Sequence, residues 1–197
     1  MKVFLLAIVN TNSKPCNVLE KVSDVSSFSF FQRSSIDDFL TFFATTVAER
    51  TSPGQRQGVD ENNYTAFAYN RTDGLAAVVI TDTEYPNRVA LSLAGKLLDE
   101  FSALNPKASE LTKGDGRFQP QLNKYLVDYQ SPRQADVIMN VQMELDETKV
   151  VLHKTIESVL ERGERLDNLV EKSNQLSDQS KMFYKTAKKT NSCCSIM

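Results

Sequence analysis

The chain has 197 residues, of which 41% are apolar and 24% are charged, and its formal net charge at pH 7 is −2. This length and apolar content suit one folded domain with an additional element, and they argue against global disorder. The small net charge provides no overall basic field, so nucleic acid is excluded as an expected partner. Three cysteines, two of them within the last five residues, cannot build a disulfide framework, and this usage is typical of a cytosolic protein.

Neither a signal peptide nor a transmembrane helix is expected. The apolar run at residues 3–9 is short and has no small-residue cleavage site after it, so it suits a buried first strand better than a signal peptide. No later stretch approaches 18 consecutive apolar residues. Any membrane attachment is therefore expected to be covalent or peripheral.

Residues 1–130 alternate short apolar runs with helical patterns. The expected strands cover residues 3–9, 17–22, 28–31, 64–70 and 75–81, and the expected helices cover residues 34–50, 90–104 and 119–129. Ser52-Pro53-Gly54 ends the first helix, and Asp73-Gly74 is a hairpin turn signal between the last two strands. This order predicts an α+β domain in which an antiparallel sheet lies between helices on both faces.

The pattern changes after Ser131-Pro132-Arg133. From residue 135 to residue 190 the chain has no proline and a single glycine, and apolar or small residues recur at alternating steps of three and four. The sixteen positions of this repeat are Ile138, Val141, Leu145, Thr148, Leu152, Thr155, Val159, Arg162, Leu166, Leu169, Ser173, Leu176, Ser180, Phe183, Ala187 and Thr190. A sustained seven-residue repeat predicts a left-handed coiled coil, here a helical rod of about 80 Å.

Arg162 is the one charged residue among these sixteen positions, with seven positions before it and eight after it. A guanidinium buried in an apolar bundle is costly unless its donors are matched, for example by side-chain carbonyls of partner helices. In the alternative interpretation, Arg162 lies at the edge of the seam and extends its charged end into water. Its central position favours the matched core site.

The last four residues, Cys194-Ser195-Ile196-Met197, form a C-a-a-X ending that directly follows Cys193. Such an ending predicts a thioether lipid on Cys194, and the terminal Met favours a farnesyl group. Because one lipid of modest length binds membranes only reversibly, a second lipid on Cys193 would give stable attachment. The alternative is a polar tail whose cysteines carry no lipid.

The residues around Arg162, from Val159 to Leu169, resemble the central motif of the R-SNAREs, the synaptobrevin-like fusion proteins. The preceding 130 residues resemble the longin domain that some R-SNAREs carry. With the double-cysteine tail, the whole chain resembles the prenylated longin R-SNAREs, in which a lipidated tail replaces the usual transmembrane helix. The domains are then longin 1–130, linker 131–137, R-SNARE motif 138–190 and lipidated tail 191–197.

The resemblance implies a vesicular R-SNARE that assembles with three Q-SNARE helices (Qa, Qb and Qc) into a parallel four-helix bundle and so drives membrane fusion. Arg162 would form the ionic layer against three glutamines, and the other fifteen seam residues would form the SNARE layers. The resemblance implies no cofactor and no metal. Its further partners would be a prenyltransferase and the SNARE disassembly ATPase with its adaptor.

The resemblance also implies the lipids and the location of the protein. Cys194 would carry a farnesyl group and a methyl ester after removal of Ser195-Ile196-Met197, and Cys193 would carry a palmitoyl or second prenyl group. The expected location is the cytoplasm and the cytosolic face of Golgi, ER-derived vesicle, endosomal and vacuolar membranes.

A farnesylated protein in the cytosol must hide its lipid, and the first helix offers a surface for this. Phe39 and Phe43 belong to its apolar face, whereas Phe42 lies roughly 100° away around the helix. Phe42 either widens the core stripe or belongs to a second groove that binds the folded-back SNARE motif and the lipid. The second interpretation predicts an autoinhibited form held by an intramolecular contact between longin domain and SNARE motif.

Three rival classes can be compared with these features. A prenylated GTPase needs G-x-x-x-x-G-K-[ST], but Ala90 and Leu97 stand at two of the required positions around Gly95-Lys96, so this class is rejected. An S-acyltransferase that modifies its own cysteines has only Cys16 and the single histidine, His153, to draw on, and we predict no enzyme. A lipidated coiled-coil adaptor would be indifferent to the loss of Arg162.

Overall fold

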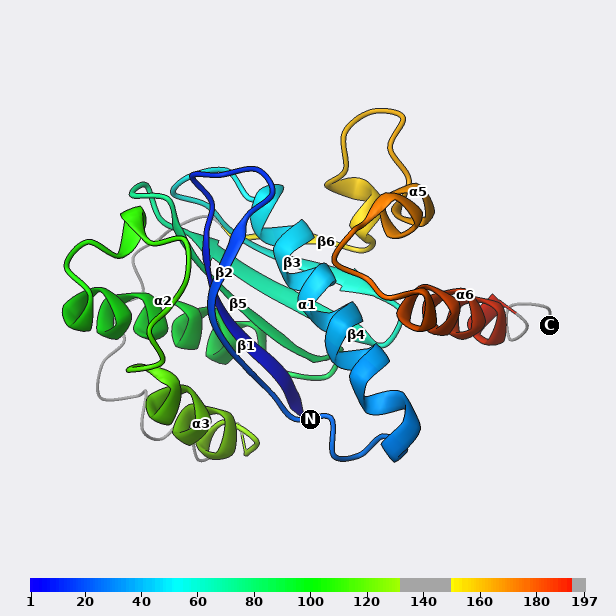
Figure 1. Ribbon diagram of the computed structural model, residues 1–197, viewed down its shortest axis with the longest axis horizontal. Helices are drawn as coiled ribbons and strands as arrows, with labels where there is room; N and C mark the ends of the chain where they lie inside the picture. The colour runs from blue at the N-terminus through cyan, green and yellow to red at the C-terminus, as the bar shows by residue number, and fades with distance from the viewer. Residues whose placement is uncertain (132–149, 193–197) are drawn as a thin grey trace.

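The computed structural model describes residues 1–131 and 150–192, which form a six-stranded sheet flanked by helices (Figure 1). The strands are β1 (Val3–Asn10), β2 (Asn17–Ser23), β3 (Arg56–Glu61), β4 (Tyr64–Asn70), β5 (Leu75–Asp82) and β6 (Val150–His153). The helices are α1 (Arg33–Glu49), α2 (Asn87–Leu104), α3 (Gln119–Asp128), α5 (Leu166–Lys172) and α6 (Asp178–Ser192), with 3-10 turns η1 (Phe30–Gln32), η2 (Ala108–Glu110) and η3 (Ile156–Ser158). The α+β class predicted from the sequence is confirmed.

The strands lie in the order β2-β1-β5-β4-β3-β6. The pairs among the first five strands are antiparallel, as predicted, whereas β6 pairs with β3 in parallel, so the complete sheet is mixed. The predicted hairpin between β4 and β5 is present, and Gly74 takes a φ of +85° in its turn, a conformation that glycine adopts without steric cost.

Both faces of the sheet are covered by helices. Alternate residues of β1 point to opposite faces, so that Leu6 and Ile8 pack with α2 and α3 while Leu5 and Ala7 pack with α1. Strands buried on both faces consist of nearly continuous apolar residues, which is why β1 and β5 have no polar side in the sequence. Figure 1 shows α1 crossing one face of the sheet.

Two local predictions for residues 1–130 are wrong. Residues 28–31 form no strand, because the Arg33 guanidinium donates hydrogen bonds to the carbonyls of Ser26 (3.0 Å) and Phe28 (3.1 Å) and so stabilises a turn that leads into η1. The strand β3 was not predicted, because its sequence, RQGVDE, is polar and contains a glycine. Its backbone pairs with β4 on one side and with β6 on the other.

The C-terminal segment, by which we mean residues 150–192, differs from the predicted rod. It consists of β6, η3, α5 and α6, connected by turns, and it lies along β3 and α1 (Figure 1). Residues 150–153 form a strand and not a helix, and a further break falls at Arg162-Gly163, where Gly163 has a φ of +91° that a helix does not allow. Apolar residues of the segment are buried against α1 instead of against partner helices. Positions 138, 141, 145 and 148 of the repeat lie outside the described residues.

Candidate functional site

The candidate site is the surface on which the C-terminal segment lies. It consists of α1 and the outer edge of β3, and we call it the docking face. Four kinds of contact hold the segment there: strand pairing, apolar burial, hydrogen bonds near the start of α1 and ion pairs at its end.

Strand pairing holds the first part of the C-terminal segment. Four residues of β6 pair with β3 in parallel register, from Arg56 opposite Val150 to Val59 opposite His153. Gly58 lies beneath Leu152, and a Cβ atom at Gly58 would stand 2.8 Å from the Leu152 Cδ2 and 3.0 Å from the Phe67 Cε1. The absence of a side chain at Gly58 therefore makes room for Leu152 on the edge of the sheet.

Apolar burial holds the middle and the end of the segment. Ile156 and Val170 are 0% exposed, and Leu166, Leu176 and Tyr184 are also buried, all in the cluster formed by α1 and the sheet. Phe39 of α1 stacks on Tyr184 with ring centroids 5.5 Å apart. Complete burial of one such side chain contributes roughly 1.5–3 kcal/mol, so these five residues dominate the docking.

The start of α6 is bonded to the N-terminal half of α1 through Asp38. The Ser180 hydroxyl, which is fully buried, donates to the Asp38 Oδ2 at 2.8 Å, and the Ser177 hydroxyl donates to the same oxygen at 3.3 Å. The Ser177 Oγ also accepts a hydrogen bond from the Ser180 backbone N–H at 3.2 Å, so it caps α6. A carboxylate beside a helix N-terminus is favoured by the helix dipole.

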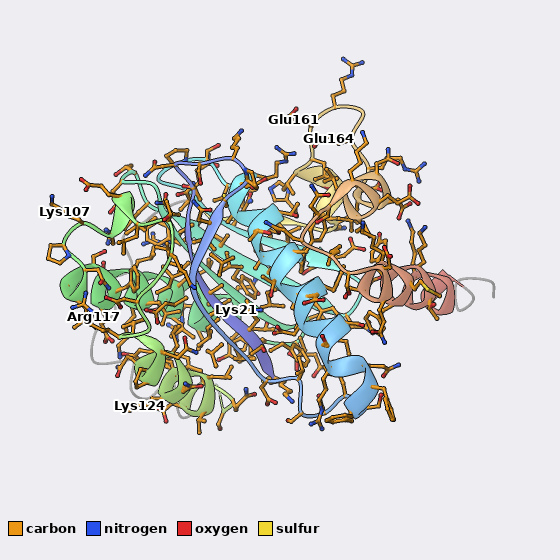
Figure 2. The ribbon with its side chains drawn as sticks, in the orientation of Figure 1. Lys21, Lys107, Arg117, Lys124, Glu161 and Glu164 are labelled. Atoms are coloured by element: carbon orange, nitrogen blue, oxygen red, sulfur yellow. The ribbon has the colours of Figure 1, made fainter. Side chains whose placement is uncertain are left out.

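The other end of α1 is held by Arg50, the residue that follows the helix. Its guanidinium pairs with the Glu164 carboxylate at 2.8 Å and with the Glu161 carboxylate at 3.3 Å. Figure 2 shows both glutamates on the loop that precedes α5. Arg50 is only 16% exposed and Glu164 is 30% exposed, so this pair is partly shielded from solvent. Arg162 stands between the two glutamates in sequence and is exposed.

Contacts inside the C-terminal segment join α5 to α6. The Asp167 carboxylate accepts hydrogen bonds from the Lys188 Nζ at 2.7 Å and from the Tyr184 hydroxyl at 3.0 Å. Lys188, and then Tyr184, hold the pKa of Asp167 below its usual value despite an opposing effect of burial. Burial, and then Asp167, raise the pKa of Tyr184, which therefore stays protonated and acts as the donor.

Glu61, the last residue of β3, faces this part of the segment. Burial raises its pKa, and a hydrogen bond from the backbone N–H of Ile156 opposes that effect. Lys188 lowers the pKa of Glu61, whereas Glu157 and Asp167 raise it. The segment thus acts on Glu61 in both directions, and burial is the effect that disfavours its ionised form in the docked structure.

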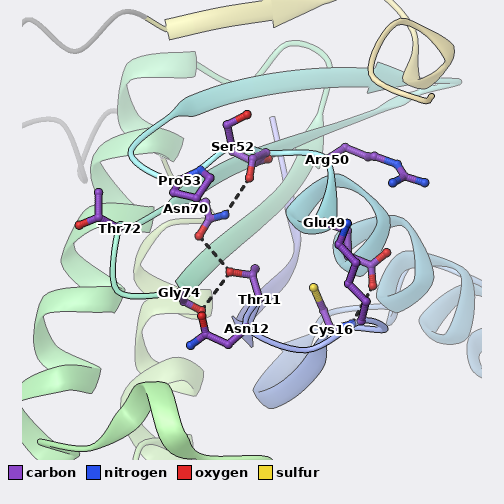
Figure 3. Close-up of a pocket in the computed structure, with 12 residues that line it drawn as sticks. Thr11, Asn12, Cys16, Glu49, Arg50, Ser52, Pro53, Asn70, Thr72 and Gly74 are labelled. Carbon is purple, nitrogen blue, oxygen red and sulfur yellow. Dashed lines mark hydrogen bonds between the residues drawn. The ribbon is translucent and has the colours of Figure 1, made fainter. Parts of the chain in front are cut away.

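A polar cavity of about 340 Å³ lies beside the C-terminal end of α1 (Figure 3). Cys16 borders it, and its backbone N–H donates to the Glu49 Oε1 at 2.7 Å. Burial, and then the Glu49 carboxylate, raise the pKa of the Cys16 thiol to about 12. A thiol that stays protonated at neutral pH is a poor nucleophile. Within residues 1–131 and 150–192, no group of three or more His, Cys, Asp or Glu side chains is arranged to hold a metal ion.

The residues expected to form the groove lie on α1 and are buried. Phe39, Phe42 and Phe43 belong to the same cluster as the apolar residues of the C-terminal segment. Phe42 is 7% exposed and borders a cavity of about 280 Å³ together with Gln175 of the C-terminal segment. The helix face that includes Phe42 therefore contacts both the body of the domain and the segment.

The structure distributes the expected layer residues over several environments. Leu166, Leu176 and Ser180 are buried, Val159, Leu169, Ser173 and Phe183 are half-buried, and Leu152, Thr155 and Arg162 are exposed. Positions 187 and 190 belong to α6, and Cys193 and Cys194 lie outside the described residues. Three of the most buried residues, Ile156, Val170 and Tyr184, are not among the sixteen positions; each directly follows one of them.

Comparison with known families assigns both parts of the chain. Residues 25–126 match the longin family model, described as a regulated-SNARE-like domain, and residues 137–195 match the synaptobrevin model. These matches, on a sheet flanked by helices and followed by a seven-residue repeat with a central arginine, define the class as a SNARE with an N-terminal longin domain.

Full-length relatives narrow the class further. The chain is 57% identical over 196 residues to the synaptobrevin homolog ykt6 of Schizosaccharomyces pombe. It is 52% identical over 200 residues to the synaptobrevin homolog YKT6 of Saccharomyces cerevisiae and 53% identical over 200 residues to that of Yarrowia lipolytica. Each match covers 100% of both chains. The chain belongs to the longin R-SNAREs of the synaptobrevin family, and its role is that of an R-SNARE in vesicle fusion.

Within the described residues, no helix is long and apolar enough to cross a bilayer.

Proposed function

We propose that the C-terminal segment exchanges between the docking face and a parallel four-helix bundle with Qa, Qb and Qc helices. One observation carries this proposal: Leu166, Leu176 and Ser180 are layer positions of the repeat and are buried on the docking face. The same side chains cannot be buried in two places at once. Docking therefore competes with bundle assembly, and the longin domain acts as an inhibitor of its own SNARE motif.

In the bundle, Arg162 provides the ionic layer and the remaining seam positions, from Ile138 to Thr190, provide the SNARE layers. The family assignment and the uninterrupted repeat support this role. In the docked form Arg162 is exposed between two glutamates that pair with Arg50. Undocking breaks those ion pairs, straightens the chain at Gly163 and leaves Arg162 free to meet glutamine side chains. Disassembly of the bundle would require the SNARE disassembly ATPase with its adaptor.

The C-terminal tail provides a lipid anchor in this proposal. A prenyltransferase would add farnesyl to Cys194, followed by removal of residues 195–197 and methylation, and Cys193 would receive a palmitoyl or second prenyl group. The tail sequence supports this, and so does the end of α6 at Ser192, because the helix that is pulled during zippering then leads directly into the anchor. The membranes concerned would be those of the Golgi, ER-derived vesicles, endosomes and vacuole, with a docked pool in the cytoplasm.

S-acyl transfer is not part of the proposal. Burial and the Glu49 carboxylate raise the pKa of the Cys16 thiol to about 12, and Lys14, which lowers it, has the smallest of these effects, so the thiol stays protonated at neutral pH.

The experiment that tests the proposed exchange compares Tyr184→Ser with the unaltered chain in a mixture with three Q-SNARE helices. Tyr184 is buried on the docking face but is not a layer residue, so its loss weakens docking and keeps the layers. We expect a faster gain of helical circular dichroism and of complexes that resist denaturing gels. An Arg162→Ala chain serves as the second arm, because it retains docking and loses the ionic layer. Equal assembly rates for Tyr184→Ser and the unaltered chain would contradict the proposal.

A further inference from the structure

Two phenylalanines stand out on the surface. Phe30 is 78% exposed and Phe31 is 83% exposed, the highest values among the large apolar side chains of the described residues. Their rings lie edge to face with centroids 5.9 Å apart, so they form one feature, which we call the aromatic tip. Neither the SNARE layers nor the docking face uses these residues.

The base of the aromatic tip is firmly held. Arg33 donates to the carbonyls of Ser26 and Phe28, and the Ser29 hydroxyl donates to the Gln32 Oε1 at 3.0 Å. The ring of Phe28 packs on Phe4 with centroids 6.0 Å apart. The two exposed rings therefore project from a structured turn, and their exposure does not come from a loose chain end.

The aromatic tip lies at the N-terminal end of α1, which is also the end that α6 contacts. It runs directly into α1, and α6 contacts the N-terminal half of that helix through Asp38 and Phe39. Asp38 is six residues beyond Gln32, about 9 Å along the helix axis. In Figure 1 the start of α1 and the whole of α6 lie on the side of the molecule away from α2 and α3. Cys193 directly follows α6 in the sequence.

We propose that the aromatic tip inserts into the interfacial region of a lipid bilayer and gives the protein a second membrane contact beside its lipid anchor. The anchor part rests on the proposed function; the insertion of the tip does not. Exposed phenylalanine rings can be buried at the boundary between acyl chains and headgroups, as in the apolar faces of interfacial helices. A farnesyl group alone holds a protein only marginally and reversibly, and the tip would supply the additional contact until Cys193 is acylated.

The shape and charge of the tip favour a membrane over a protein partner. Two phenylalanines offer roughly 150–250 Å² each, well below the roughly 800 Å² that each side of a specific protein interface buries. Lys2 is paired with Asp24 at 3.1 Å and Lys21 with Asp37 at 2.7 Å, whereas Arg33 at the base of the tip donates to backbone carbonyls and keeps its charge. Binding is therefore driven mainly by apolar insertion, and anionic lipid should add at most the attraction of one guanidinium.

The sequence permits a clean optical test because it contains no tryptophan. Phe31→Trp places a single indole on the aromatic tip, and Val127→Trp places one on α3, at a position that is 72% exposed. Both substitutions are made in the full chain with Cys193→Ser and Cys194→Ser, which removes the lipids. Phosphatidylcholine vesicles are then added, with and without phosphatidylserine.

We expect the emission of Phe31→Trp to shift to the blue and to be quenched by brominated acyl chains, to a similar degree with both vesicle types. The emission of Val127→Trp should stay unchanged. A Phe30→Ser/Phe31→Ser chain should show a vesicle partition coefficient at least about tenfold lower than that of the parent, and Val127→Ser should match the parent. Unchanged thermal unfolding would confirm that the surface substitutions leave the fold intact.

Two results would overturn the inference. One is an unshifted Phe31→Trp emission at lipid concentrations that bind the farnesylated chain. The other is a shift that requires added Q-SNARE helices and no vesicles, which would assign the tip to a protein interface. If the farnesylated chain itself failed to bind vesicles, the anchor would be refuted, and the lipid-free chains would still decide the role of the tip.

Discussion

The C-terminal segment carries two sets of apolar residues that differ by one position. The layer positions form a seam with a strict seven-residue repeat, whereas Ile156, Val170 and Tyr184 each follow a layer position and are buried on the docking face. One amino-acid sequence thus encodes two burial patterns, one for a bundle and one for α1. The second set gives the docked form contacts of its own, so the two states are separable by mutation.

The largest expected effect comes from the docking residues outside the seam. Val170→Asp places a carboxylate at a site that is 0% exposed, and the loss of apolar burial together with an unpaired buried charge should cost the docked form about 3 kcal/mol or more. The protein should then be mostly undocked and assemble with Q-SNARE helices without delay. Hydrogen exchange of α1 amides, which lose their cover, measures undocking.

The matched control for Val170→Asp is Asn168→Asp, which adds the same charge at an exposed position of α5. Protection of α1 should stay unchanged in that variant. If Val170→Asp also left the protection unchanged, the separation between layer and docking residues would be wrong.

A smaller effect is expected from the sheet edge. Gly58→Val should push Leu152 and Phe67 out of position, because even a Cβ atom meets them at 2.8–3.0 Å, and overpacking of this kind costs roughly 1–3 kcal/mol. Amide exchange of β6 should accelerate. Gly95→Ala is the control, because a Cβ atom there has nothing within 4 Å.

Because Phe67 belongs to the core, a second variant is needed to tell damage to the core from loss of the pairing between β3 and β6. The combination Gly58→Val with Leu152→Ala relieves the contact with Leu152 and should restore part of the pairing between β3 and β6. A combination that behaved like Gly58→Val alone would show that the damage lies in the core.

The ion pairs of Arg50 should contribute about 1 kcal/mol, because Glu161 is 70% exposed and only Glu164 is partly shielded. Arg50→Gln should raise the undocked fraction a few-fold at low salt and much less at 1 M salt. Arg117→Gln, which removes an exposed guanidinium paired with Asp115, is the control. Restored docking in the double reversal Arg50→Glu with Glu164→Arg would assign the effect to this pair.

The smallest expected effect is that of pH. The pKa of Glu61 is raised, so its ionisation opposes docking at neutral pH, and docking should tighten as the pH falls through that raised value. The pKa of Asp167 is lowered, so its contribution to the contact between α5 and α6 is complete above pH 3.8 and is lost at lower pH. Docking measured by α1 amide protection should therefore pass through an optimum on the acid side of neutrality. Glu61→Gln should remove the tightening, and an unchanged profile in that variant would contradict this assignment.

The fold of residues 1–130 could largely be predicted from the sequence, because buried strands such as β1 and β5 and the amphipathic helices have strong local patterns. The strand β3 could not, since this polar strand is stabilised by its pairing with β4 and β6 and not by its own residues. Residues 28–31 show the opposite case: their apolar run predicts a strand, but the hydrogen bonds of Arg33 hold it as a turn.

The candidate site could be predicted only in part. The repeat and Arg162 indicate the SNARE motif, whereas the sequence leaves open whether Phe42, next to Phe39 and Phe43, widens the core stripe or belongs to a groove that binds this motif. The docked conformation could not be predicted from the sequence, because the heptad repeat favours a single helix and the competing contacts come from residues 94 or more positions away. Arg50, Asp38 and Gly58 have no signal of their own; their roles arise from where the fold places them.

The competition between docking and assembly is tested most directly by a distance measurement across the two parts of the molecule. Spin labels at Lys124→Cys on α3 and Met182→Cys on α6, both exposed positions, in a chain with Cys193→Ser and Cys194→Ser, report docking by pulsed electron resonance. We predict one narrow distance distribution for the free protein, replaced by longer and broader distances at the rate at which the bundle forms with Q-SNARE helices. A bundle that forms while the narrow distribution persists would contradict the proposed exchange.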